Sequence, residues 1–346
     1  MKKHYFLLVT LFLMIGTGAR AAVIDSIYYN LTHVYEAEVT RDSVNNKGYS
    51  GDIVIPDTVY YKGVAYRVVT VGNSAFAGSE GLNSVTLPSS VRSINNAAFS
   101  KCTHLSRVTM GDNITTIADN AFAGCTLLMG LKLPASLKTI GYQAFADCAS
   151  LTALIVPDGV TSIGQSAFRR CIDLRSITLP KPLKLIDNDM FRDCSALEQI
   201  DIPQQVTDIR QNAFRGCTSL KRISFGRSVT TVDDNAFRDC TALTSVVLAN
   251  QINKVGVGAF RGCKNLKTIT LGAAMESLFA NAFGDCSSLA DVFLQSDKIP
   301  KTDQEVFSGS PLTNATLHCR PAMVDIYKIA KPWSNFGHHT PIAPVQ

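Results

Sequence analysis

Apolar positions return at one fixed interval along most of this chain. The repeating phrase is clearest from Cys148 to Phe168, which reads C-x2-L-x2-L-x-V-P-x2-V-x2-I-x3-A-F. The cysteine recurs at Cys171 and the phenylalanine at Phe191, a step of 23 residues in each case. A unit of this length is too small to bury its apolar face alone and must stack on its neighbours. The pattern therefore predicts a solenoid, a β-rich coil of 23-residue repeats.

Each repeat predicts one strand followed by two turns. The segment L-x2-L-x-V alternates inward and outward residues as a half-buried strand does, so stacked repeats build a parallel sheet with roughly 4.8 Å between strands. Proline then ends the pairing, as at Pro157, and Val160 and Ile163 supply two more inward residues. A polar residue two positions before phenylalanine predicts the N-cap of a short helical turn. These residues are Ser74, Asn120, Ser166, Asp189, Asn212, Asn235 and Asn281.

The N-terminus has the pattern of an export signal. Lys2 and Lys3 precede an apolar run from Tyr5 to Ile15, and Ala19-Arg20-Ala21 follows as a small-x-small cleavage site. The run is short for a membrane span, although a retained anchor is the alternative. We expect export to the extracellular space or cell surface, with the periplasm as a second location, and no membrane insertion after cleavage.

The repeat phase divides the rest of the chain. We expect a signal peptide at 1–21, an N-terminal cap at 22–52, a first coil at 53–81, the repeat solenoid at 82–310 and a strand-helix cap at 311–346. Extra residues around Lys62-Gly63, flanked by tyrosines, predict a hairpin inserted in the first coil.

The C-terminal segment departs from the repeat. Residues 323–330 predict an amphipathic helix, and the chain's one tryptophan, Trp333, follows it. We interpret Trp333 as part of the lid over the last coil rather than as a stacking platform for a ligand. His338-His339 is interpreted as a solvated tail rather than a metal site.

Nine of the ten cysteines share one phase of the repeat. Side chains one coil apart place Cβ atoms about 4.8 Å apart, beyond the usual disulfide range of about 3.5–4.5 Å. The same phase holds Ser79 and Ser310 in the end coils, which we expect to be the most exposed. We therefore predict a structural column of free, buried thiols, with disulfides as the alternative for an exported protein. The column is Cys102, Cys125, Cys148, Cys171, Cys194, Cys217, Cys240, Cys263 and Cys286.

Charge and motifs exclude several functional classes. Removing Lys2, Lys3 and Arg20 leaves 30 Lys and Arg against 28 Asp and Glu, so the mature chain is nearly neutral and no nucleic-acid partner is expected. The chain has no H-E-x2-H, no G-x-S-x-G and no glycine-rich phosphate loop. We predict no catalytic residues, no cofactor and no metal.

One solvent-facing column is basic. The residue after phenylalanine is arginine in five successive repeats, and stacked guanidinium groups suit carboxylates, sulfates or phosphates. The alternative is that Asp193, Asp239 and nearby acids neutralise the column. The outward strand positions form a second polar face on which a protein or glycan could bind. The candidate ligand-binding residues are Arg169, Arg192, Arg215, Arg238 and Arg261.

The coil from Leu151 to Cys171, with its L-x2-L-x-V-P-x2-V-x2-I-x3-A-F-x2-C pattern, resembles the BspA-like leucine-rich repeat family of exported bacterial surface proteins. The resemblance implies a right-handed leucine-rich repeat solenoid capped at both ends. It also implies surface exposure or secretion and adhesion to host matrix proteins or other cells. The family offers no catalytic motif.

These observations favour an exported, non-catalytic recognition scaffold that binds a host or cell-surface protein through its repeats. The alternative is an accessory protein that binds acidic or other polysaccharides, for which the arginine column is the main support. A hydrolase with residues from several coils is a third hypothesis. The sequence does not predict the oligomeric state.

Overall fold

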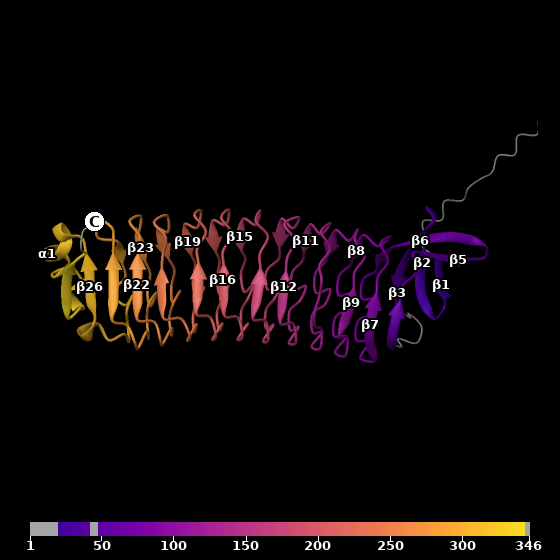
Figure 1. Cartoon of the computed structure of the whole chain (residues 1–346), viewed down its shortest axis with the longest axis horizontal. Helices are drawn as coiled ribbons and strands as arrows, with labels where there is room; N and C mark the ends of the chain where they lie inside the picture. Colours follow the sequence, from indigo (N-terminus) through magenta and orange to yellow (C-terminus); the bar gives the residue numbers. More distant parts are fainter. Residues whose placement is uncertain (1–19, 42–47, 343–346) are drawn as a thin grey trace, which may run out of the picture.

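The computed structural model of the chain describes residues 20–41 and 48–342. They form a long rod in which each turn of the chain lies against the next (Figure 1). Equivalent residues of neighbouring turns pair in parallel, as Ile117 does with Ile140. The predicted solenoid is confirmed. Most of the predicted signal peptide, residues 1–19, lies outside the described residues.

The predicted strands form a first ladder along one side of the rod, but this ladder is interrupted. Pairing stops between β14 and β16 and between β18 and β20, and residues 128–134 form no strand. The prediction of one strand in every coil was therefore wrong at this coil. The strands are β4 (Gly51–Val54), β7 (Leu82–Thr86), β9 (Arg107–Thr109), β12 (Ala153–Ile155), β14 (Ser176–Thr178), β16 (Gln199–Asp201), β18 (Arg222–Ser224), β20 (Ser245–Val247), β22 (Thr268–Leu271), β24 (Asp291–Leu294), β26 (Thr316–Cys319) and β27 (His338–Pro341).

A second parallel ladder runs beside the first, where the sequence predicted only two inward residues. Apart from β6, its strands are two residues long, which is too brief to show the alternation by which strands are recognised. Among the described strands of this ladder, pairing stops between β13 and β15 and is otherwise continuous. The strands are β6 (Val64–Val71), β8 (Ser93–Ile94), β10 (Thr116–Ile117), β11 (Thr139–Ile140), β13 (Ser162–Ile163), β15 (Leu185–Ile186), β17 (Asp208–Ile209), β19 (Thr231–Val232), β21 (Lys254–Val255), β23 (Ser277–Leu278) and β25 (Lys301–Thr302).

The predicted helical turns of the repeats are wrong. The residue two positions before phenylalanine has a left-handed backbone, with φ of 58° at Ser166 and 55° at Asn212. A second left-handed residue precedes each of the nine column cysteines, such as Asp193 with φ of 60°. Asn, Asp and Gly adopt this conformation more easily than other residues, which explains their frequency there. The polar residues interpreted as N-caps therefore shape tight turns.

Phenylalanine and cysteine fill the centre of the rod. The rings from Phe76 to Phe307 form one stack, with centroids 4.9–5.8 Å apart and planes within 2–19° of parallel. The nine column cysteines are fully buried. Each coil therefore buries its largest apolar side chain against the equivalent side chain of the next.

The N-terminal segment extends the second ladder. Strands β1 (Arg20–Ile24), β2 (Ile27–Leu31) and β3 (Glu36–Thr40) form an antiparallel meander, and β3 pairs in parallel with β6. Strand β5 (Thr58–Tyr61) pairs antiparallel with β6 through a turn at Lys62-Gly63, whose φ values are 52° and 79°.

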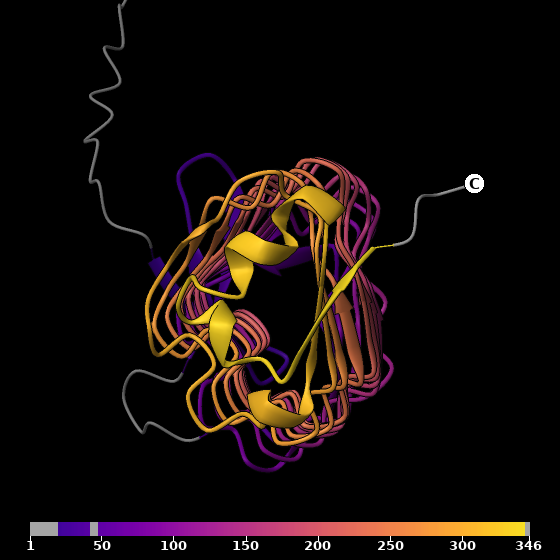
Figure 2. The same cartoon turned by 90° about the vertical axis from the view of Figure 1, so that its left-hand side faces the viewer.

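The C-terminal segment lies across the last coil (Figure 2). Trp333 is fully buried and meets Phe307 edge-on at 5.7 Å. The α-helix is shorter than predicted, and His338-His339 lies in strand β27 rather than in a tail. The imidazole Nε2 of His339 is 3.0 Å from the carbonyl oxygen of Trp333. The elements are η1 (Leu312–Asn314), η2 (Pro321–Met323), α1 (Val324–Tyr327) and η3 (Trp333–Asn335).

The phenylalanine stack makes a direct prediction about stability. Phe191→Ala removes a ring that is stacked on both sides, so it should lower the free energy of unfolding by about 3–5 kcal/mol. Phe191→Leu refills most of the space and should cost less. Chemical denaturation followed by circular dichroism measures both. A loss below about 1 kcal/mol for the alanine variant would contradict the stacked core.

Candidate functional site

The five arginines of the basic column lie on one side of the rod and are half-buried. Three of them already have carboxylate partners. Arg192 lies 3.3 Å from Asp189 and 3.5 Å from Asp193. The column is therefore partly neutralised by its own repeats, as the alternative interpretation held. The two further pairs are Arg238 with Asp239 at 3.5 Å and Arg261 with Asp285 at 2.9 Å.

Arg169 and Arg215 differ from the other three. Neither has a carboxylate oxygen within 4.0 Å in the described part of the chain. The Nε atoms of Arg169, Arg192 and Arg238 are buried without a hydrogen-bond acceptor. Whether the column binds an anion therefore stays a prediction that depends on competition with the resident aspartates.

The cysteine column has a role that the sequence did not reveal. Each thiol donates a hydrogen bond to the carbonyl of the phenylalanine one coil earlier, as Cys171 does to Phe145 over 3.2 Å. Ser310 makes the same bond to Phe283 over 2.8 Å. All ten cysteines are free thiols. The thiols therefore satisfy buried backbone carbonyls as well as filling space.

Burial also makes these thiols unreactive. It raises the pKa of Cys171 to about 12, and it raises the pKa of Cys148 well above the ordinary value. Thiolate is the reactive form, so the column should resist oxidation and alkylation. The exposure argument for Ser79 was wrong, because Ser79 is only 1% exposed. Its hydroxyl instead accepts a hydrogen bond from the amide of Tyr49.

The described residues contain no group of three or more His, Cys, Asp or Glu side chains that could hold a metal ion. Within residues 20–41 and 48–342, no helix has the length and hydropathy needed to cross a bilayer.

The structure adds one surface feature that sequence reasoning missed, an apolar hollow of about 650 Å³ between β9 and β12. It lies where residues 128–134 form no strand. The residues around it are Asp112, Gly130, Leu131, Lys132, Leu133, Pro134, Ala135, Ala153, Leu154, Ile155 and Pro157.

The hollow follows from a local break in the first ladder. Gly130 has a φ of 57°, a left-handed conformation that strand residues do not adopt. None of the amides of residues 130–133 donates a hydrogen bond to another described residue. The ladder is therefore open at this segment, where Leu131, Leu133 and Leu154 lie buried beneath the hollow and Ile155 is the large apolar lining residue that is exposed.

One exposed apolar side chain, Ile155, lines the hollow, and Met129 precedes the lining residue Gly130 in the chain. Ile155 is 72% exposed and Met129 is 54% exposed. Most coils place polar residues at these two positions, for example Thr178 and Arg175. A contiguous apolar patch on a polar surface is typical of a protein-binding site. The signals available in the sequence were Met129, an apolar residue in a largely polar column, and Ile155, whose column also holds Val54, Val247 and Phe293.

Comparisons with known proteins agree on the fold. A family model described as the BspA type leucine-rich repeat region matches residues 64–171, 138–267 and 219–327, in six copies. A leucine-rich repeat protein from Bacteroides ovatus is 27% identical, with a TM-score of 0.69 over 92% of this chain and 88% of that one. A comparison with curated proteins gave no match.

Two more distant structures share the fold. A leucine-rich cell surface protein from Faecalibacterium prausnitzii is 24% identical, with a TM-score of 0.59 over 94% of this chain and 95% of that one. The pneumococcal vaccine antigen PcpA is 18% identical, with a TM-score of 0.50 over 95% of this chain and the whole of that one.

The buried thiols predict a loss of stability at alkaline pH. In the unfolded chain a thiol loses its proton near pH 9, whereas folded Cys171 keeps its proton to about pH 12. The unfolded state then binds fewer protons, so the free energy of unfolding falls as pH rises from 9 towards 12. Each such thiol contributes about 1.4 kcal/mol per pH unit. Urea denaturation between pH 7.5 and 11 measures the slope.

Cys171→Ala is the matched control. It should reduce the fall in the free energy of unfolding by the contribution of one thiol, about 1.4 kcal/mol per pH unit. A free energy of unfolding that does not change between pH 8 and 11 would contradict buried free thiols. Buried free thiols would also be contradicted if thiol titration of the denatured, unreduced chain detected one thiol or fewer.

The broken ladder predicts fast amide exchange at the hollow. The amides of Leu131 and Leu133 have no hydrogen-bond acceptor among the described residues, whereas the amide of Val156 in the next coil donates to Thr178 over 3.0 Å. Hydrogen exchange should therefore be much faster in a peptide that covers 130–134 than in one that covers 153–157. Mass spectrometry of the native protein compares the two. Equal protection would mean that the ladder is closed in solution.

Proposed function

Because the chain belongs to the BspA-type leucine-rich repeat family, we propose that it is an exported, non-catalytic recognition scaffold that binds a host or cell-surface protein. One structural neighbour of this fold is described as a leucine-rich cell surface protein. In such proteins the inward columns are fixed by packing, so recognition depends on the outward ones. The observation that carries the proposal is the apolar hollow beside β12.

A protein partner fits the chemistry of the hollow. Leu131, Leu133 and Leu154 form a floor whose side chains are only 3–6% exposed, and Ile155, which also lines the hollow, is 72% exposed. A leucine or aromatic side chain of the partner would remove this surface from water, and full burial of one such side chain contributes about 1.5–3 kcal/mol. A polysaccharide with few apolar faces would gain much less.

The rim of the hollow is suited to orienting a partner. Asp112 and Lys132 lie at its border, and the polar strand face continues beyond it through β14 and β16. Protein interfaces commonly combine an apolar centre with a polar rim of this kind. The partner would therefore contact the first ladder, which carries the mixed charges of the repeats.

Binding of an acidic glycan at the arginine column has less support. The aspartates beside Arg192, Arg238 and Arg261 occupy the positions where sulfate or carboxylate groups would bind. A polyanion would have to displace these partners or use Arg169 and Arg215 alone. The hydrolase hypothesis has no supporting observation among the described residues.

Ile155→Thr tests the proposal, because threonine is the residue of the same column in several other coils. Ile155 is largely exposed, so the free energy of unfolding should change by less than about 0.5 kcal/mol. Binding to the partner should weaken by about tenfold, the equivalent of roughly 1.4 kcal/mol. An array of extracellular matrix proteins and glycans, read at several salt concentrations, identifies the partner, and surface plasmon resonance measures the loss.

Val247→Thr is the matched control. Val247 belongs to the same column and is 63% exposed, but it lies four coils away from the hollow. Its substitution should leave binding unchanged. Equal binding by the Ile155→Thr variant, or a salt-sensitive glycan signal lost in an Arg192/Arg215/Arg238→Ala variant, would overturn the proposal. Recovery of the native protein from the cytoplasm would overturn export.

A further inference from the structure

The N-terminal segment caps only one of the two ladders. The meander β1–β3 extends the second ladder through the pairing of β3 with β6. The first ladder begins at β4, which pairs with β7 and with no other described strand. One edge of β4 is therefore the unpaired end of a parallel sheet.

The backbone groups on that edge can be assigned. The amide of Gly51 donates to Gly81 over 2.7 Å, and the amide of Ile55 donates to Thr86 over 2.9 Å. Backbone groups alternate in direction along a strand, so Asp52 and Val54 direct their N–H and C=O groups away from β7. None of these four groups has a hydrogen-bond partner in the described part of the chain.

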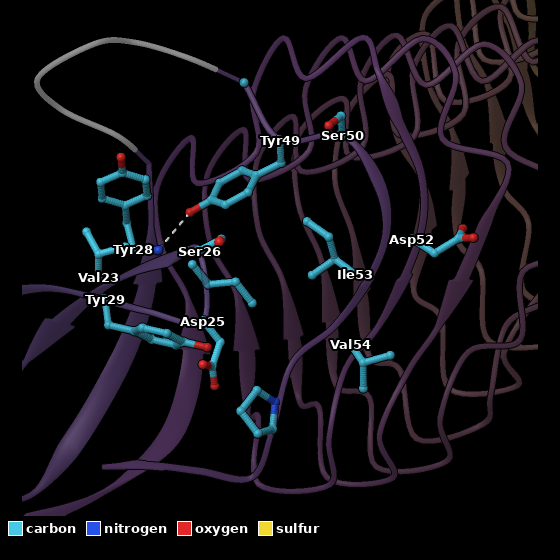
Figure 3. Close-up of a pocket in the computed structure, with 13 residues that line it drawn as sticks. Val23, Asp25, Ser26, Tyr28, Tyr29, Tyr49, Ser50, Asp52, Ile53 and Val54 are labelled. Atoms are coloured by element: carbon cyan, nitrogen blue, oxygen red, sulfur yellow. Dashed lines mark hydrogen bonds between the residues drawn. The ribbon is translucent and has the colours of Figure 1, made fainter. Parts of the chain in front are cut away.

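The unpaired edge of β4 borders a hollow of about 640 Å³, which we call the edge hollow. Figure 3 shows Ile53 and Val54 on one side of it, with Tyr29 and Asp25 of the β1–β2 hairpin on the other. The wall above is held by Tyr49, whose hydroxyl accepts a hydrogen bond from the Tyr28 amide over 3.0 Å.

The hydroxyl of Tyr49 also donates to the carbonyl of Thr40 over 2.6 Å. The Tyr49 hydroxyl is therefore hydrogen-bonded to both β2 and the end of β3. Because these bonds fix the position of the side chain, the edge hollow is a preformed feature of the cap.

The charged residues that line the edge hollow are acidic. Asp25 and Asp52 are both among its lining residues, and no Lys, Arg or His is among the lining residues that the structure describes. Val23, Ile27 and Val54 add apolar surface beside these carboxylates. An occupant that carries a basic side chain next to an apolar one would match both kinds of surface.

We propose that the edge hollow binds an extended segment of a partner protein, which adds to the first ladder as a further strand beside β4. Only a peptide backbone presents donors and acceptors at the spacing of Asp52 and Val54. The bound segment carries a Lys or Arg towards Asp25 and Asp52 and an apolar residue towards Val23 and Ile27. This site is separate from the apolar hollow beside β12 and does not depend on it.

Val54→Pro tests the proposal without disturbing the existing sheet. The amides of Gly51 and Ile55 donate towards the β7 side, and Ile53 between them is in register with Val85 of β7. Proline at 54 therefore removes one outward N–H and places its ring in the path of an added strand. Val54 is 70% exposed, so its side chain is not needed for packing. Val54→Ala keeps the N–H and is the matched control.

The probe is a displayed library of random eight-residue peptides selected on the wild-type protein. Enriched peptides should combine a basic with an apolar residue. They should bind Val54→Ala as they bind wild type, and bind Val54→Pro about tenfold more weakly or worse, as expected for a lost backbone hydrogen bond and a blocked edge. Peptide binding should also slow hydrogen exchange at the amides of Asp52 and Val54.

A second variant keeps the test valid if Val54→Pro does not fold. Asp25→Asn with Asp52→Asn preserves both side-chain shapes and should weaken the basic peptides several-fold. Failure to enrich any peptide, equal binding to the proline variant, or unchanged exchange at Asp52 and Val54 would overturn the proposal. Self-association of the wild type that Val54→Pro abolishes would also overturn it, because the occupant would then be a second copy of this chain. Ile155→Thr should leave peptide binding unchanged.

Discussion

The structure depends on the contact between each coil and the next. A single coil offers one phenylalanine, one cysteine and a few aliphatic side chains, which cannot form a closed core by themselves. Stacking places Phe168 between Phe145 and Phe191, at 5.7 and 5.5 Å. The same stacking brings each thiol to a phenylalanine carbonyl of the preceding coil, as for Cys194 and Phe168. Apolar burial and backbone hydrogen bonding therefore favour the same register.

This constraint explains what the sequence could predict. Phe168 and Cys171 recur because only one side chain fits each central position, and a strict recurrence is visible without a structure. The left-handed turns were misread, because Asn and Asp are common both at helix N-caps and in left-handed conformations. The second ladder was missed because two-residue strands such as β10 are formed by pairing between coils rather than by a local pattern.

The candidate sites were harder to predict for a related reason. A binding surface on a repeat protein often occurs where residues differ from the repeat pattern. The effect of such a residue, for example Gly130, can be judged only when the positions of the neighbouring coils are known. The arginine column was visible in the sequence, but its pairing with Asp239 and Asp285 depends on side-chain geometry. The two hollows that we propose as binding sites occur where the first ladder is incomplete, at residues 128–134 and at β4. At each of these places, backbone N–H groups without a partner among the described residues lie near an exposed apolar side chain, Ile155 at the first and Val54 at the second.

Distances between spin labels test the stacking of coils most directly. Cysteines introduced at Thr109 and at Asp201, Ser224 or Val247 can be labelled selectively, because the native thiols are buried. These three positions lie four, five and six coils from Thr109. Stacking predicts narrow distributions centred near roughly 19, 24 and 29 Å, a rise of about 4.8 Å per coil. Broad distributions, or distances that do not rise with the number of coils, would contradict a continuous rod.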